Sequence, residues 1–286
     1  MNSEKAALYA KNSRAQFFWN TAFLSEIAWN RSHNTKVVDI GCGTGESTKN
    51  LLATRDEVES VLAFDISSNM IDYANEHNSH EKIVYKVGNI EDIDLVTKLE
   101  GQAAVCKRGS FDRVVSLNVL HWVKDQTVAL KNIVSFLRPG GDCLLVFGSK
   151  PSPAFLHAKT EILKSEAWKD MIHDDVNWRH GRNSKWLKYS EWRLPDPADG
   201  YRRLCEKERL VVTKSEVREV KYTFVSVEEC KGVLQYLLPH VQQIPKELVP
   251  KFMDDVYDLF QSVCMKDTNG QCMWHAHFLF VTATLP

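Results

Sequence analysis

The segment of residues 36–47, KVVDIGCGTGES, constrains the possible folds of this chain more than any other. Its apolar start is typical of a buried parallel strand, and three glycines then allow a tight turn into a helix: Gly41, Gly43 and Gly45. Glu46 stands where a dinucleotide-binding fingerprint has its third glycine, so no pyrophosphate is expected on this helix. Asp39, at the end of the strand, would repel phosphates but suits an ammonium or sulfonium cation. The segment therefore predicts a nucleotide-type cofactor loop that suits S-adenosylmethionine better than NAD.

Strands and helices alternate after this loop. The residue patterns predict strands at 58–67, 82–88, 111–123 and 141–149, and helices at 46–55, 67–77 and 126–137. This spacing indicates βαβ units and a parallel sheet, with ligands bound at the carboxyl ends of the strands. Asp65 ends the second strand twenty residues after Gly45, where a carboxylate can accept both hydroxyls of a ribose. Asn89 and Ile90 end the third strand, where they either contact an adenine ring or form an Asx turn.

The flanking segments predict further helices within a single domain of residues 1–286. Residues 1–35 have apolar side chains at helical spacing and are expected to lie over the active site. Residues 150–214 hold four tryptophans and no strand pattern before 210, so we expect a helical cap insertion. Its aromatic and basic residues at 178–193 could also bind single-stranded RNA, but nearby acids nearly cancel their charge. A strand at 216–225, helices at 227–238 and 245–265, and a last strand that closes the sheet follow.

Charge and cysteine content exclude several functional classes. A net charge of −1, from 36 basic and 37 acidic residues, gives no general attraction to nucleic acid or an anionic membrane, so a small-molecule substrate is expected. Seven cysteines without a CxxC pair indicate reduced thiols rather than disulfides or zinc sites. His275 and His277 are expected to be packed strand residues rather than metal ligands. No apolar run approaches the roughly 20 residues of a membrane span, and we expect a cytoplasmic protein.

Five motifs in order give the chain a family likeness: VVDIGCGTG, LAFDIS, GNI, FDRVVSLNVLHWV and LRPGG. As a set they resemble the class I S-adenosylmethionine-dependent methyltransferases. The resemblance implies an α/β, Rossmann-like, seven-stranded and mainly parallel sheet with its last strand antiparallel. It also implies that Asp39, Gly41 and Gly43 hold the methionine part of the cofactor, Asp65 the ribose, and Ile66 and Asn89 the adenine. Further residues in or beside these motifs are expected in the cofactor site: Cys42, Gly45, Met70, Ile90 and Asn118.

A narrower likeness reaches both ends of the chain. The segments LYAKNSRAQ at 8–16, LNVLHWV at 117–123 and LQYLLPH at 234–240 resemble the arthropod juvenile hormone acid methyltransferases. This resemblance implies methylation of farnesoic acid or juvenile hormone acid, with the substrate carboxylate held by Gln16 and Trp122. The family usually has an acid where this chain has Asn89.

The chemistry of methyl transfer fits these residues. A carboxylic acid with a pKa of about 4 to 5 is already ionised at pH 7, so it needs no general base. The Gln16 amide and the Trp122 indole N–H are neutral donors that could orient it, unless they belong to a solvated helix face and to the core. His121 is the candidate base for a hydroxyl or amine acceptor; with an acid it would only orient the substrate.

Four alternatives stay open from the sequence. The first two are a methyltransferase for another small acid and one for a hydroxyl, amine or RNA acceptor. The others are a non-catalytic S-adenosylmethionine-binding protein and an NAD-dependent oxidoreductase. Asp39 and Glu46 disfavour the oxidoreductase.

Overall fold

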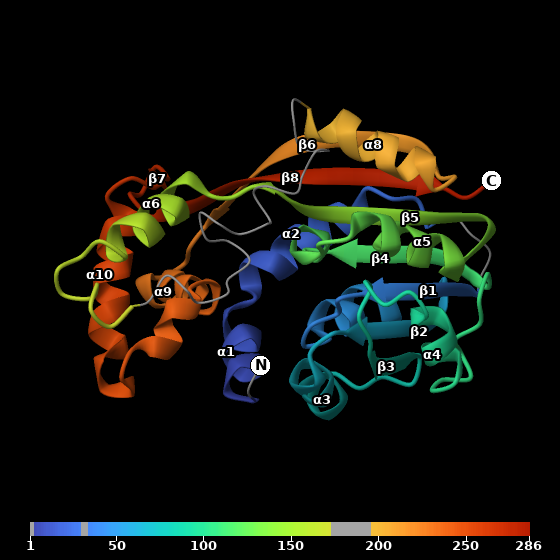
Figure 1. The fold of residues 1–286 in the computed structure, drawn as a ribbon, viewed down its shortest axis with the longest axis horizontal. Helices are drawn as coiled ribbons and strands as arrows, with labels where there is room; N and C mark the ends of the chain where they lie inside the picture. Colours follow the sequence, from blue (N-terminus) through green and yellow to red (C-terminus); the bar gives the residue numbers. More distant parts are fainter. Residues whose placement is uncertain (1–2, 30–33, 173–195) are drawn as a thin grey trace.

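The computed structural model describes residues 3–29, 34–172 and 196–286. Its sheet has the strand order β3-β2-β1-β4-β5-β8-β6, with the short β7 paired to β8 (Figure 1). Strands β1 to β5 are parallel, whereas β8 runs antiparallel to β5 and β6. The prediction of a mainly parallel Rossmann-like sheet with an antiparallel last strand is confirmed. The strands are β1 Thr35–Ile40, β2 Val58–Asp65, β3 Ile83–Val87, β4 Phe111–Leu117, β5 Leu137–Lys150, β6 Val211–Thr223, β7 Met265–Lys266 and β8 Cys272–Thr284.

Two apolar cores lie on the two faces of the sheet, because the central strands are apolar at successive positions. In β1, Val37 packs into the first core and Val38 into the second. In β4, Val115 likewise packs into the first core and Val114 into the second. The first core takes side chains from α2, α3, α6, α9 and α10, and the second from α4, α5 and α8. The helices are α1 Ser3–Asn12, α2 Arg14–Ser25, α3 Ser68–His77, α4 Leu95–Glu100, α5 Gln126–Phe136, α6 Pro153–Ile162, α8 Pro197–Lys207, α9 Val227–Leu237 and α10 Val249–Gln261.

Two elements beside the glycine loop differ from the sequence prediction. The helix after the glycine loop begins at Glu46, but over Thr48–Ala53 it is wound as a π-helix. The strand predicted at 111–123 ends at Leu117, because Asn118 has a φ of 63° and leaves the extended conformation. A 3₁₀ turn, Leu120–Trp122, follows and carries the histidine and tryptophan of the HW pair. Both departures occur where the chain turns away from the sheet beside the glycine loop.

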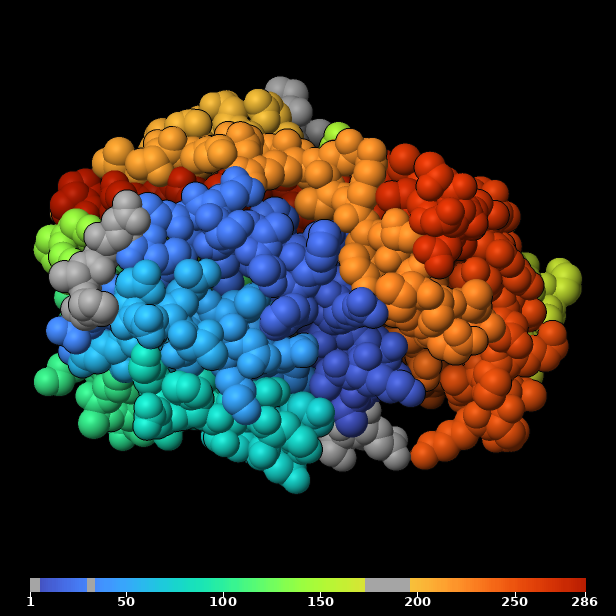
Figure 2. Space-filling view, turned by 180° about the vertical axis from the view of Figure 1, so that it is seen from behind, coloured from blue at the N-terminus to red at the C-terminus, as the bar shows by residue number. Residues whose placement is uncertain are grey.

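The N-terminal helices connect the two halves of the molecule. Helix α1 packs against α3 on one side and α9 on the other, and Figure 2 shows it between them. Within the expected cap, α6 packs on α10 and α8 packs on β6 and β8. The aromatic and basic residues at 178–193 lie outside the described residues. None of the described helices has the length and apolar character needed to cross a membrane.

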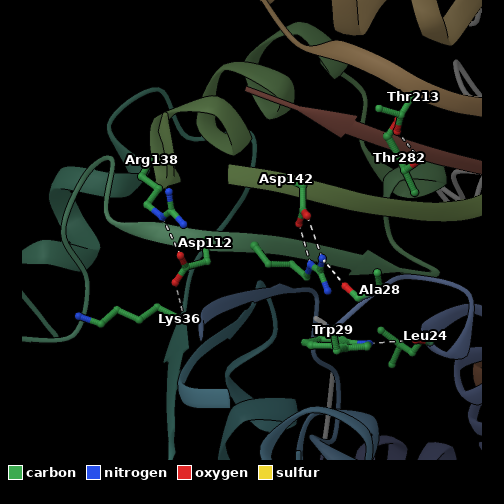
Figure 3. Close-up of polar contacts among 10 residues, drawn as sticks. Leu24, Ala28, Trp29, Lys36, Asp112, Arg138, Asp142, Thr213 and Thr282 are labelled. Atoms are coloured by element: carbon green, nitrogen blue, oxygen red, sulfur yellow. Dashed lines mark hydrogen bonds and ion pairs between the residues drawn. The ribbon is translucent and has the colours of Figure 1, made fainter. Parts of the chain in front are cut away.

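Ion pairs join the amino ends of the strands, at the edge away from the glycine loop. Asp112 accepts hydrogen bonds from the Lys36 backbone N–H at 2.7 Å and from Arg138 Nε at 2.6 Å, which links β1, β4 and β5 (Figure 3). Arg113 is buried and binds both carboxylate oxygens of Asp142, at 2.6 and 2.8 Å. Arg113 also donates to the Ala28 carbonyl at 3.0 Å. These pairs fix the segment before β1 and so help to position the helices that precede it.

Candidate active site

A pocket lies at the carboxyl ends of β1 and β4, between the glycine loop and the N-terminal helices. It is the position that the topology of a parallel sheet provides for a ligand. Three parts of the chain line it. The loop side is formed by Asp39, Gly41, Cys42, Thr44, Glu46, Ser47 and Leu52, and the end of β4 contributes Leu117 and Asn118. The N-terminal segment contributes Tyr9, Ser13, Gln16, Phe17, Asn20 and Leu24. Five of the residues expected from the sequence therefore line one pocket: Gln16, Asp39, Gly41, Cys42 and Asn118.

The glycine loop is held by β2 and closed against β4. The backbone N–H groups of Gly41 and Cys42 both donate to the carbonyl of Phe64, at 2.7 and 3.1 Å. Gly41 has a φ of 72°, and a Cβ there would lie 2.2 Å from Cγ2 of Val119. No larger residue fits without movement of the chain after β4. The loop thus brings the backbone into the pocket, with Gly43 and Gly45 also at positive φ.

Two carboxylates stand at the ends of β1 and β2. Asp39 is buried and accepts a hydrogen bond from Thr48 Oγ1 at 2.6 Å, and burial raises the pKa of Asp39 to about 6. Asp65 accepts from the backbone N–H of Gly43 at 3.1 Å and of Ser67 at 2.9 Å, and burial raises the pKa of Asp65 as well. Each oxygen of Asp65 has a second lone pair, so it can still accept a ribose hydroxyl.

These groups fit S-adenosylmethionine. Its ammonium and sulfonium charges match the carboxylate of Asp39, which lacks a cationic partner among the described residues that line the pocket. The ribose hydroxyls match Asp65, which stands at the end of the neighbouring strand β2. Cys42 contributes backbone and bulk rather than a reactive thiol, because burial raises its pKa.

The residues expected around the adenine lie outside this pocket. Ile66 is 56 % exposed, whereas Met70 and Ile90 are buried, Ile90 in the core beneath α5. Asn89 Oδ1 accepts the backbone N–H of Glu91 at 3.1 Å, which is the Asx-turn alternative raised from the sequence. The adenine contacts of Ile66, Asn89 and Ile90, and the cofactor contact of Met70, stay predictions.

Of the three residues expected to hold the acceptor, Gln16 is among those that line the pocket, whereas His121 and Trp122 are not. Gln16 lines the pocket, and its Nε2 donates a hydrogen bond to the hydroxyl of Tyr236 in α9. His121 Nδ1 accepts the backbone N–H of Gly148 at 3.3 Å, and the ring of Trp122 lies 4.9 Å from that of His121. Because a backbone N–H can only donate, the neutral histidine carries its proton on Nε2. His121 in this state is a donor rather than a base.

Sequence reasoning missed the polar residues of α1 and α2 that complete the pocket. Ser13 Oγ donates to Glu46 Oε2 at 2.8 Å, and Asn20 bonds to both sides of the pocket. Its Nδ2 donates to Ser47 Oγ at 3.0 Å, and its Oδ1 accepts from Asn118 Nδ2 at 2.9 Å. The signal that could have found them is spacing: residues 9, 13, 16 and 20 recur at intervals of three and four, a helical period that continues across the break between α1 and α2 at Ser13.

No metal centre accompanies the pocket in the described residues, since they contain no group of three or more potential ligand side chains. His275 and His277 are neighbours on β8, with ring centres 5.2 Å apart and planes inclined at 59°, and His275 pairs with Glu219 at 2.8 Å.

Comparison with known proteins agrees with this geometry. Residues 38–145 match the family model of the methyltransferase domain. The chain is 29 % identical over 249 residues to juvenile hormone acid O-methyltransferase of Drosophila melanogaster, covering 84 % of this chain and 76 % of the relative. It is 25 % identical to the Bombyx mori protein of the same name, covering 85 % and 80 %.

A solved structure shares the fold at low identity. Phosphoethanolamine N-methyltransferase 2 of Haemonchus contortus matches with a TM-score of 0.58 at 16 % identity, covering all of this chain, which spans 57 % of that protein. The domain match, the relatives, the sheet and the glycine-loop pocket together support a class I S-adenosylmethionine-dependent methyltransferase.

Proposed function

We propose that this methyltransferase esterifies the carboxylate of an apolar sesquiterpenoid acid, farnesoic acid or juvenile hormone acid, to its methyl ester. The observation that carries the proposal is the position of Gln16, a neutral amide that lines the same pocket as the cofactor loop. The likeness to two juvenile hormone acid O-methyltransferases over most of the chain supports this choice of acceptor. Trp122 and His121 complete the proposed carboxylate site.

The chain's residues have three tasks in this reaction. S-adenosylmethionine supplies an electrophilic methyl group on a positively charged sulfur. Asp39 and Asp65 hold the cofactor by charge and hydrogen bonds, and α1 and α2 exclude water from the pocket. The Gln16 amide and the Trp122 indole then orient the acceptor.

The donors that face the acceptor are neutral. A carboxylate oxygen forms the new bond to carbon as the carbon–sulfur bond breaks, so no proton has to move. A neutral donor leaves the oxygen more nucleophilic than a buried cation would. The Nε2–H of His121, set by the contact of Nδ1 with Gly148, belongs to the same class of donor.

The proposal is tested by transfer of labelled methyl from S-adenosylmethionine to farnesoic acid, juvenile hormone acid, linear fatty acids and bulk RNA. We expect labelled ester from the terpenoid acids, which mild alkali converts to volatile labelled methanol. Gln16→Ala and Trp122→Ala should each lower kcat/KM at least tenfold, about 1.4 kcal/mol of transition-state stabilisation, and leave cofactor affinity within about twofold. Gln102→Ala, which removes an exposed glutamine remote from the pocket lining, is the matched control.

Three results would contradict the proposal. Alkali-stable label would mean an ether, amine or base methyl group, and would return His121 to the role of general base. Parallel losses of turnover and cofactor binding in the two variants would remove their assignment to the acceptor. Cofactor binding without labelled product would favour a non-catalytic protein.

A further inference from the structure

Tyr236 reaches the site from α9, 220 residues away in sequence from the side chain that it contacts. Its hydroxyl accepts the hydrogen bond from Gln16 Nε2. Gln16 Oε1 is buried and has no hydrogen-bond partner in the described parts of the chain. One end of the amide is therefore held by a phenol, and the other end is left for a group that the protein does not supply.

The position of Tyr236 is fixed by the contact between α1 and α9. Its ring packs edge-on against that of Tyr9, with centres 5.2 Å apart and planes at 66°. One turn earlier on α9, Gly232 lies so close to Asn12 that a Cβ would be 1.9 Å from Oδ1 of that side chain. Tyr9 itself lines the pocket. The phenol of Tyr236 is thus held against the pocket wall by close backbone and ring packing.

The chemistry of the pair allows two orientations of the amide. A phenol both donates and accepts hydrogen bonds, whereas a carboxamide has one donor end and one acceptor end of nearly equal shape. With Nε2 on Tyr236, the unpaired Oε1 would repel an acceptor carboxylate. After a half turn of the amide, Tyr236 donates to Oε1, and both N–H groups of Nε2 become available to the carboxylate. Burial raises the pKa of Tyr236, so the phenol keeps the proton that this arrangement needs.

We propose that Tyr236 is a positioning residue, which orients the Gln16 carboxamide so that its N–H groups face the carboxylate of the acceptor. This inference rests on the proposed function, because it assumes an acid as acceptor. Tyr236 acts through Gln16, so its effect disappears when Gln16 is absent.

The test is a double-mutant cycle of Tyr236→Phe and Gln16→Ala. Two quantities are measured with farnesoic acid as the substrate. They are kcat/KM for ester formation, and the calorimetric Kd of farnesoic acid in the presence of S-adenosylhomocysteine. In the wild-type background, Tyr236→Phe should weaken acid binding and lower kcat/KM by about fivefold to tenfold, the loss expected for one hydrogen bond. In the Gln16→Ala background, the same change should have less than about a twofold effect. Tyr257→Phe is the matched control, because it removes a phenol from the neighbouring α10 that contacts Cys272 rather than Gln16.

Each other outcome overturns the inference. Equal factors in both backgrounds would mean that Tyr236 acts independently of Gln16, and an unchanged Kd in Tyr236→Phe would mean that it does not act at all. Loss of S-adenosylhomocysteine binding in Tyr236→Phe would show that the phenol supports the fold instead. Failure of the proposed function is distinguishable, because the wild type itself would then form no ester from any acid.

Discussion

Asp39 provides a quantitative test of the cofactor site in the absence of the cofactor. Burial raises the pKa of this carboxyl from 3.8 to about 6 in the folded chain. A group whose pKa is raised by folding stabilises the fold fully below its unfolded pKa, and this stabilisation is lost as the pH rises through the folded pKa. The free energy of unfolding should therefore fall between pH about 4 and about 6. At 1.36 kcal/mol per pKa unit, the loss amounts to about 3 kcal/mol.

The assay is urea unfolding of the cofactor-free protein at intervals from pH 4 to pH 8, for the wild type and for Asp39→Asn. The variant has no charge to bury, so its free energy of unfolding should lack this part of the pH dependence and should exceed that of the wild type at pH 8. Thr48→Val removes the 2.6 Å hydrogen bond to the carboxylate and should move the wild-type transition to higher pH. Parallel curves for wild type and Asp39→Asn would refute the reasoning. The same variant should bind S-adenosylmethionine more weakly at pH 8, because the buried negative charge matches the cationic cofactor.

The other predictions concern packing and charge, and urea unfolding measures both. Gly41→Ala should lower the free energy of unfolding by about 2 to 5 kcal/mol, because Gly41 has a positive φ of 72° and the added Cβ would lie 2.2 Å from Val119. Gly43→Ala should lower it by only about 1 to 2 kcal/mol, because the nearest atom to the added Cβ is 3.7 Å away. Equal costs would contradict this, and Val119→Ala should restore part of the loss in Gly41→Ala. Arg113→Met should cost about 3 to 5 kcal/mol, because Asp142 loses its bidentate partner. The double change Arg113→Met with Asp142→Leu should recover most of that loss, and a double variant as unstable as the single one would argue against the ion pair.

The sheet and the glycine loop were predictable because local patterns determine them. Apolar runs of strand length, separated by helical spacing, are sufficient to place β1 to β5, and the glycines before Glu46 identify the loop. The predicted strand at 111–123 was too long, because periodicity does not reveal that Asn118 adopts a positive φ. Its φ of 63° depends on tertiary bonds, from its N–H to Val146 and from its side chain to Asn20.

The surroundings of Gln16, on the proposed acceptor side of the site, were predictable only in part. Gln16 was identified through a family resemblance, which assigns a role to the residue but does not predict which side chains surround it. Its partner Tyr236 lies within a motif noted for the same resemblance, yet nothing local to that motif predicts a contact with α2. The wall formed by Tyr9, Ser13 and Asn20 depends on where α1 and α2 dock, and docking is set by packing against α3 and α9 rather than by the helical sequence alone.

The position of β8 has a consequence for how the protein is made. This strand follows every other strand in the chain, but it lies between β5 and β6 in the sheet. Until β8 has left the ribosome, β5 presents an open edge and β6 has no neighbour with which to pair. Nascent chains that stall before residue 272 should therefore hold a nearly complete cofactor loop and still be prone to aggregate, and they would be expected to depend on chaperones. The tyrosine that contacts Gln16 lies between β6 and β8, so the proposed acceptor side should also mature late in synthesis.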